Sequence, residues 1–154
     1  MKKMVIIALS IICMATANAN EEFLLKFKDN NQILLDMNEW TKLSDEGNYT
    51  FYLSKESNEI NTGYYKVHSL VEFPDPNGVE YKNLNGPVKR IFSYGIMDCE
   101  QGIFFLLGDF YTDKDNVIVF SSQFEMGTRQ VEVLTPNTAR NKAYIKVCIV
   151  KHSV

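Results

Sequence analysis

Two cysteines, Cys99 and Cys148, constrain the fold of this chain more than any other sequence feature. Cys99 ends a strand-like run that begins at Arg90, and Cys148 lies late in a run with helical spacing that opens at Thr135-Pro136. In an exported protein, such a pair is typical of a disulfide. The two settings together predict a carboxyl-terminal helix joined covalently to a β-sheet.

The amino-terminal segment predicts export. It has the positive start, the apolar run and the small-x-small cleavage pattern of a secretory signal, in Lys2-Lys3, residues 4–14 and Ala17-Asn18-Ala19. Cys13 follows the apolar run, but Ile12 stands where a lipobox needs a small residue. We therefore favour soluble export over a lipid anchor. No apolar run reaches the roughly 20 residues that a membrane-spanning helix needs.

The chain divides into three expected segments: a signal peptide at 1–19, a lead-in at 20–38 that pairs weakly with the body, and a single domain at 39–154. Cleavage leaves 135 residues and removes two lysines but no acid, which takes the net charge from −3 to −5. A mildly acidic chain is a poor nucleic-acid binder. We expect a periplasmic or secreted protein, with cell-surface association left open.

Period-two alternation broken by short turn signals dominates the chain from Glu39 onward. Parallel neighbours need long crossovers, so the short turns predict antiparallel pairing. The polar stretch 54–62 is expected to be a loop. The fold class is therefore predicted as α+β, an antiparallel sheet of about six strands with a carboxyl-terminal α-helix packed on it and linked by the disulfide. The strand-like segments are 39–44, 49–53, 63–73, 88–98, 101–111, 117–121 and 129–134.

The helix is expected to begin at Thr135, a hydroxyl N-cap, followed by Pro136 at the first helical position. Small and apolar residues recur at three- and four-residue spacing and form one face, which we expect to pack on the sheet. Its members are Ala139, Ala143, Tyr144, Val147 and Cys148. A disulfide closing a loop of about 50 residues would contribute about 4 kcal/mol in the chain-entropy model.

The sequence contains no recognisable catalytic or metal-binding motif. Neither His68 nor His152 has other ligand residues at metal-site spacing, and we expect His68 on the polar face of a strand. Asp109, Asp113 and Asp115 bracket a hairpin without the spacing of a calcium loop, so turn chemistry explains them better. We predict no enzymatic activity, no metal and no cofactor.

Tyrosines on strand faces are candidate contacts for a protein partner, because tyrosine is enriched at interfaces. Tyr52, Tyr64 and Tyr94 are the candidates. The alternative, that they are ordinary solvent-facing strand residues, is favoured.

Several segments together resemble the surface-adhesin protein E family of Gram-negative bacteria. They are Tyr94-Gly-Ile-Met-Asp-Cys99, the strand through Asp109-Phe-Tyr111, Leu134-Thr-Pro-Asn-Thr138 and Val147-Cys148. The resemblance runs from about Trp40 to Cys148 and rests on the order of these pieces, with one cysteine in each half.

The resemblance implies a sheet of about six antiparallel strands with a helix linked to it by the two cysteines. It also implies that the protein can form homodimers and binds host matrix or serum proteins such as vitronectin and laminin. In the family, the binding stretch leads into the first cysteine, which corresponds here to residues 86–94. The candidate partner-binding residues are therefore Lys89, Arg90, Phe92 and Tyr94, of which only the first two are cations.

The predicted function is that of a non-enzymatic exported binding protein. Two alternatives stay open: a periplasmic accessory domain with no host ligand, and a small-ligand carrier of the haem-binding type that uses an aromatic groove at a dimer interface.

Overall fold

The computed structural model describes residues 26–29, 31–124 and 130–149. The predicted signal peptide with Cys13 lies outside the described residues, and so does His152. Within the described part of the chain, no helix is long and apolar enough to cross a membrane.

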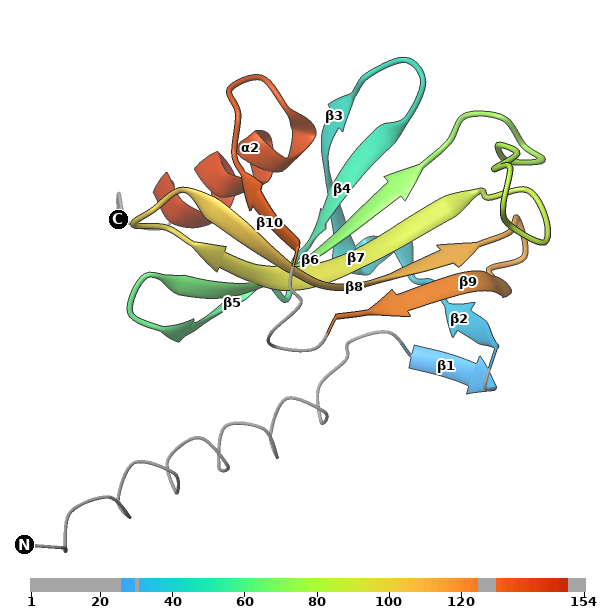
Figure 1. Cartoon of the computed structure of the whole chain (residues 1–154), viewed down its shortest axis with the longest axis horizontal. Helices are drawn as coiled ribbons and strands as arrows, with labels where there is room; N and C mark the ends of the chain where they lie inside the picture. Colours follow the sequence, from blue (N-terminus) through green and yellow to red (C-terminus); the bar gives the residue numbers. More distant parts are fainter. Residues whose placement is uncertain (1–25, 30, 125–129, 150–154) are drawn as a thin grey trace, which may run out of the picture.

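An antiparallel sheet of eight strands forms the body of the protein (Figure 1). The main path runs β10–β8–β7–β6–β4–β3, while β5 pairs with the first part of β6 and β9 with the second half of β8. The strands are β3 (Trp40–Asp45), β4 (Thr50–Ser54), β5 (Asn58–Asn61), β6 (Tyr64–Glu72), β7 (Arg90–Asp98), β8 (Ile103–Thr112), β9 (Ile118–Gln123) and β10 (Gln130–Val133).

The antiparallel pairing confirms the sequence-based prediction, but the predicted number of strands was too low and the molecule is mostly β. The segment expected to be a loop, 54–62, contains β5, whose four residues are all exposed. Because both of its faces meet solvent, β5 carries no apolar alternation that could reveal it.

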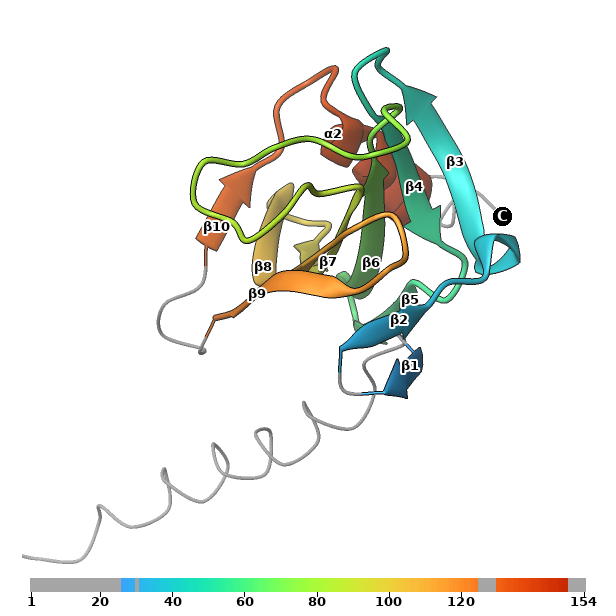
Figure 2. The same cartoon turned by 90° about the vertical axis from the view of Figure 1, so that its right-hand side faces the viewer.

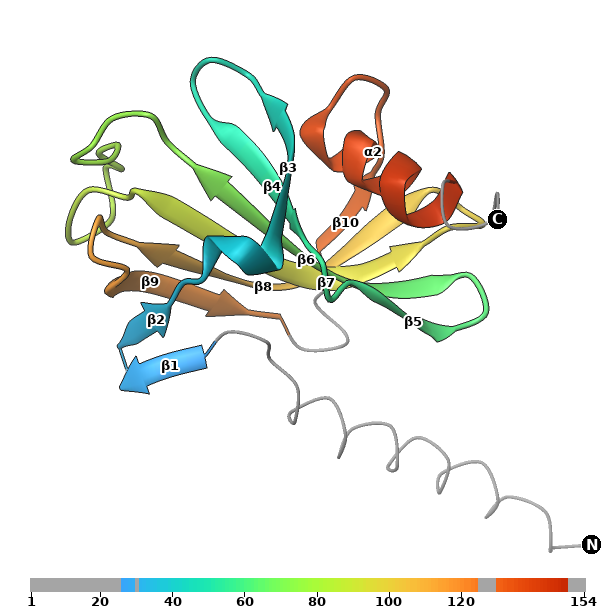
Figure 3. The same ribbon diagram turned by 180° about the vertical axis from the view of Figure 1, so that it is seen from behind.

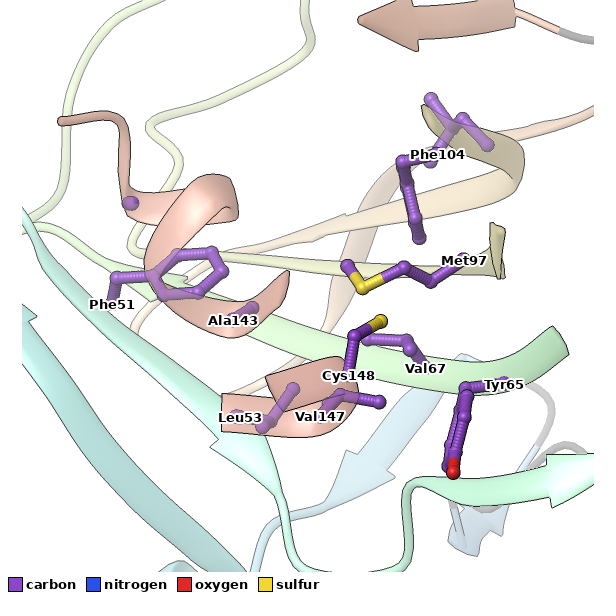
Figure 4. Packing of buried hydrophobic residues seen from close by; sticks show 11 residues of the cluster. Phe51, Leu53, Tyr65, Val67, Met97, Phe104, Ala143, Val147 and Cys148 are labelled. Atoms are coloured by element: carbon purple, nitrogen blue, oxygen red, sulfur yellow. The ribbon is translucent and has the colours of Figure 1, made fainter. Parts of the chain in front are cut away.

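The sheet is strongly curved, and the carboxyl-terminal helix lies on its concave side (Figure 2). Apolar side chains of four strands and the helix fill this side and form the helix-side core (Figure 4). Its buried members are Phe51, Leu53, Tyr65, Val67, Met97, Phe104, Leu106, Ala139, Ala143, Val147 and Cys148.

The amino-terminal lead-in covers the opposite face of the sheet as a hairpin of β1 (Lys26–Asp29) and β2 (Gln32–Leu34) (Figure 3). A 3-10 helix at Met37–Glu39 connects it to β3. Ile33 is 2% exposed and packs with Leu70, Phe92 and Phe110 in a second cluster, the hairpin-side core. Both faces of the sheet are therefore covered by apolar packing.

One extra residue in β8, Leu107, has no partner in β7 and forms a β-bulge. The bulge shifts the alternation of side chains by one position. Phe104 before it therefore belongs to the helix-side core, whereas Phe110 after it belongs to the hairpin-side core. In a regular strand, these two residues would point to the same face.

The carboxyl-terminal helix begins later than predicted. Thr138, not Thr135, is the N-cap: its side chain accepts a hydrogen bond from the Asn141 amide at 3.1 Å and donates one to the Thr135 carbonyl at 2.9 Å. The helix comprises α2 (Ala139–Tyr144) and a π-helical turn (Ile145–Ile149). Pro136 and Asn137 precede it, and Asn137 has a φ of 67°, outside helical geometry.

The helix packs on the sheet through the face that the sequence predicted, with Ala139, Ala143, Val147 and Cys148 all buried. Cys148 forms a disulfide with Cys99, and the Cα atoms are 5.5 Å apart. The Tyr144 hydroxyl donates a hydrogen bond to the Cys99 carbonyl at 3.1 Å. The predicted covalent link between the sheet and the helix is confirmed.

Candidate protein-binding surface

Lys89 directly precedes β7 and Arg90 is its first residue, and neither cation projects freely into solvent. The Lys89 ammonium donates hydrogen bonds to the carbonyl oxygens of Phe73 and Asp75, the latter at 3.0 Å. The Lys89 amide donates to the Thr112 carbonyl at 2.7 Å. Lys89 therefore holds the 74–89 loop, which connects β6 to β7, against the end of β8.

Arg90 is paired on two sides. Its guanidinium lies 2.7 Å from a Glu72 carboxylate oxygen on β6 and donates to the Asn116 side-chain oxygen at 2.7 Å. The Arg90 side chain is 16% exposed and that of Glu72 is 23% exposed. Such a pair fixes three segments relative to one another and offers a partner little unbalanced charge.

Phe92 is 1% exposed and lies in the hairpin-side core, where the Trp40 ring meets it edge-on at 6.0 Å between centroids. In this fold Phe92 supports β7 from within and presents almost no surface to a partner. The burial of Phe92 was not apparent from the stretch that leads into Cys99, because the amino-terminal lead-in that covers Phe92 lies far away in the sequence.

Tyr94 is half-buried and lies nearly parallel to His68, with 6.4 Å between ring centroids and 20° between planes. Burial raises the pKa of the Tyr94 hydroxyl, with a further contribution from Asp109. A Cβ at Gly108 would lie 2.5 Å from the Tyr94 ring. Glycine at position 108 therefore makes room for the Tyr94 ring to lie across β8.

His68 is 3% exposed, so the prediction that it lies on a polar strand face is wrong. The apolar hairpin-side core covers that face of β6 as well. Burial, together with a smaller contribution from the nearby Lys66, lowers the pKa of His68 from 6.5 to about 4. His68 is therefore neutral at physiological pH.

Four aromatic rings form a contiguous row at the end of the sheet where β7 begins. We call Phe73, Tyr81, Tyr111 and Phe120 the aromatic row. Successive ring centroids are 6.4, 6.1 and 5.4 Å apart, and the last two pairs meet edge-on. The row crosses the 74–89 loop, β8 and β9, and Tyr111 pairs in register with Ile91 of β7.

Two members of the aromatic row are exposed, Tyr81 at 37% and Phe120 at 42%. Burial raises the pKa of the Tyr81 and Tyr111 hydroxyls, so both remain protonated at neutral pH. Edge-to-face packing holds the rings in place and thus lowers the entropy lost on binding. Sequence reasoning missed this row because its members come from three separate segments.

The other tyrosines singled out from the sequence lie elsewhere. Tyr52 is half-buried and its hydroxyl lies 3.4 Å from Glu72. Tyr64 is 37% exposed, at the end of β6 remote from Arg90 in the β6–β7 register. Asp98 raises the pKa of Tyr64.

Of the three aspartates that were expected to serve the β8–β9 turn, Asp113 does so. An Asp113 carboxylate oxygen accepts hydrogen bonds from the amides of Asp115 and Val117, both at 2.9 Å. Among the described residues, no group of three His, Cys, Asp or Glu side chains is placed to hold a metal ion.

The predicted turn role is wrong for Asp109, which lies within β8, opposite Ser93, and not in the turn. Burial raises the pKa of its carboxyl, which the hydrogen bond with Ser93 and the charge of Arg140 partly offset.

The fold defines a class of small antiparallel β-domain whose carboxyl-terminal helix is tied to the sheet by a disulfide. Three structures of Haemophilus influenzae protein E share this fold. The first matches over 78% of this chain and 94% of its own length, with a TM-score of 0.52 and 16% identity. Its crystal form II covers 71% of this chain and 87% of its own at a TM-score of 0.52 and 15% identity. The selenomethionine form matches over 80% of this chain and 95% of its own length, with a TM-score of 0.52 and 14% identity.

At this level of identity, the comparison shows the fold alone. No protein-family model matches the chain, and no curated protein matches it in sequence. The resemblance to protein E that the sequence motifs indicated is thus confirmed as a likeness of fold.

Proposed function

We propose that this chain is an exported, non-enzymatic domain that binds a protein partner through the aromatic row and the adjoining start of β7. The observation that carries the proposal is the row itself, in which Tyr81 and Phe120 remain 37% and 42% exposed. Aromatic residues are enriched at protein interfaces and dominate their energetics. The sequence resemblance to the surface-adhesin protein E family supports a host matrix or serum protein, such as vitronectin or laminin, as the partner.

The four residues predicted for partner binding have distinct parts in this proposal. Lys89 and Arg90 hold the loop and the turn that frame the aromatic row. Phe92 and Tyr94 pack in the hairpin-side core, on the opposite face of the sheet, and hold β7 in place from there. Binding energy is then expected from the aromatic row, whose position these four residues fix.

Surface plasmon resonance on immobilised vitronectin and laminin tests the proposal. Replacing both exposed rings, Tyr81→Ala/Phe120→Ala, is expected to weaken binding by at least about tenfold, because two interface aromatics are lost. Tyr64→Ala removes a tyrosine of the same exposure at the other end of the sheet and is the matched control. Equal affinities for the double variant and the wild type would contradict the assignment of the surface.

The alternatives predict different outcomes. Failure of the wild type to bind either host protein would favour a periplasmic accessory role. A visible absorbance band on titration with hemin would indicate a small-ligand carrier.

We also propose that the protein is exported to the periplasm or beyond. Cell fractionation combined with surface protease accessibility tests this. Homodimer formation, implied by the resemblance, is measured by sedimentation velocity.

A further inference from the structure

β10 (Gln130–Val133) lies at one end of the sheet and has β8 as its only neighbour among the strands of residues 26–29, 31–124 and 130–149. All four of its residues are exposed. Val133 at 68% and Val131 at 56% have the highest exposed fractions among the large apolar side chains of the described residues. A strand with two highly exposed valines thus borders solvent along its outer edge.

The backbone of β10 directs hydrogen-bonding groups toward that edge. The Leu134 amide donates to the Gly102 carbonyl at 3.2 Å, across the β10–β8 pairing. Residues that exchange hydrogen bonds alternate along an antiparallel pair. Glu132 therefore bonds toward β8, whereas the N–H and C=O groups of Val131 and Val133 point away from it.

The other edges of the sheet carry bulges or a covering segment that discourage strand addition, and β10 has no bulge. β3 has a register shift between Lys42 and Ser44, and β5 has one between Glu59 and Asn61. At β9, the Ile118 amide donates to the Asn31 carbonyl at 2.7 Å, so the lead-in covers part of that edge. β10 pairs with β8 without a register shift and contains neither lysine nor proline. Bulges, lysines and covering segments are the usual protection of edge strands.

The side chains of β10 specify what could pair with it. The two valines share one face, while Glu132 lies on the other, with its carboxylate 3.2 Å from the Arg140 guanidinium. Arg140 also lies over the Phe104 ring at 4.4 Å. The Glu132 side chain remains 48% exposed. In a strand paired with β10, a lysine or arginine opposite Glu132 would therefore stabilise the pairing, and an aspartate or glutamate there would destabilise it.

We propose that β10 binds an extended segment of a partner protein, which adds to the sheet as an antiparallel strand. The segment carries apolar side chains opposite Val131 and Val133 and a lysine or arginine opposite Glu132. Strand addition of this kind derives its affinity from main-chain hydrogen bonds and its specificity from alternate side chains. The inference concerns a different surface from the aromatic row and does not depend on that proposal.

A second copy of this chain fits β10 less well. Pairing the outward groups of Val131 with those of Val133 on the copy would place the two Glu132 side chains directly opposite each other. Like charges at such positions are destabilising. A partner strand with a cation at its centre avoids this repulsion.

The test is an NMR titration of residues 20–154, the chain without its predicted signal peptide, with the capped peptide Thr-Val-Lys-Val-Thr as probe. We expect the amide signals of Val131 and Val133 to shift. Methylating both valine nitrogens of the peptide removes main-chain donors and should weaken binding by about tenfold or more, and so should replacing its lysine by glutamate.

Protein variants separate this site from other exposed edges. Val133→Lys introduces a protective charge at a position that is 68% exposed and should weaken binding by about tenfold. Ile60→Lys makes the same change on β5, at 51% exposure, and should bind the peptide normally. Unshifted β10 amides at millimolar peptide would overturn the proposal. A dimer that Val133→Lys dissociates would overturn it too, since a second copy would then occupy the edge.

Discussion

Because His68 is buried, this single residue is expected to make the stability of the fold depend on pH. The hairpin-side core leaves its imidazole 3% exposed, and burial shifts its pKa from 6.5 to about 4. The folded state therefore favours the neutral ring, while the unfolded chain takes up a proton as the pH falls below 6.5. The contribution of His68 to the free energy of unfolding is therefore fully present above pH 6.5 and is lost as the pH falls toward 4.

We expect the free energy of unfolding to fall by about 3 kcal/mol between pH 7 and pH 4 on account of His68, since each pKa unit corresponds to about 1.4 kcal/mol. His68→Gln, which does not titrate, should lack this part of the pH dependence. Urea unfolding of both proteins at the two pH values measures it. An identical loss in the variant would show that other groups cause the dependence.

Gly108 is the second residue with a specific consequence. A Cβ at this position would lie 2.6 Å from the Ser122 carbonyl oxygen, a backbone atom that cannot turn aside. Gly108→Ala is therefore expected to destabilise the protein by about 3 kcal/mol. Gly47→Ala is the control: it meets nothing within 4 Å and carries only the cost of its positive φ, about 1 kcal/mol. Chemical denaturation compares the two, and equal effects would contradict the crowding around Gly108.

At the level of elements, the sequence predicted the long central strands well. The predicted segment 63–73 is observed as Tyr64–Glu72, and 88–98 as Arg90–Asp98. Both strands lie in the middle of the sheet, each between two hydrogen-bonded neighbouring strands. The bulge at Leu107 could not be predicted, because it depends on the register with β7 and leaves the alternation of β8 intact in the sequence.

The disulfide links the end of β7 to the carboxyl-terminal helix, and its two cysteines are 49 positions apart in the sequence. Replacing both cysteines, Cys99→Ala/Cys148→Ala, is expected to lower the free energy of unfolding by about 2–4 kcal/mol. Wild-type protein unfolded in the presence of a reductant should approach the same value, since the bond is then absent. Guanidinium unfolding with and without dithiothreitol measures both. A double variant as stable as the oxidised wild type would contradict a stabilising role for the link.

At the level of the whole molecule, the sequence indicated the site by motif but not its surroundings. Lys89 and Arg90 were singled out as cations for a partner, yet each is held by acceptors from distant segments, among them Asp75 and Glu72. A motif names residues without showing what lies opposite them after folding. The aromatic row went unnoticed for the same reason, because only the folded sheet brings Tyr81, Tyr111 and Phe120 together.

The amino-terminal hairpin is integral to the domain, since it supplies Ile33 to the hairpin-side core at 2% exposure. Ile33→Ala should lower the free energy of unfolding by about 3 kcal/mol, through lost burial and the cavity left behind. Leu34→Ala, at a neighbouring position that is 50% exposed, should change it by less than about 0.5 kcal/mol. Thermal or urea unfolding distinguishes them. Comparable small effects at both positions would mean that the hairpin contributes little to stability.

The bond between Cys99 and Cys148 also determines how the molecule would carry a mechanical load. Cys148 lies near the carboxyl-terminal end of the chain, and Cys99 lies at the end of β7. Tension applied from that end passes through the sulfur atoms directly into the centre of the sheet. The strands β8, β9 and β10 lie between the two cysteines, so the load reaches β7 without passing along them.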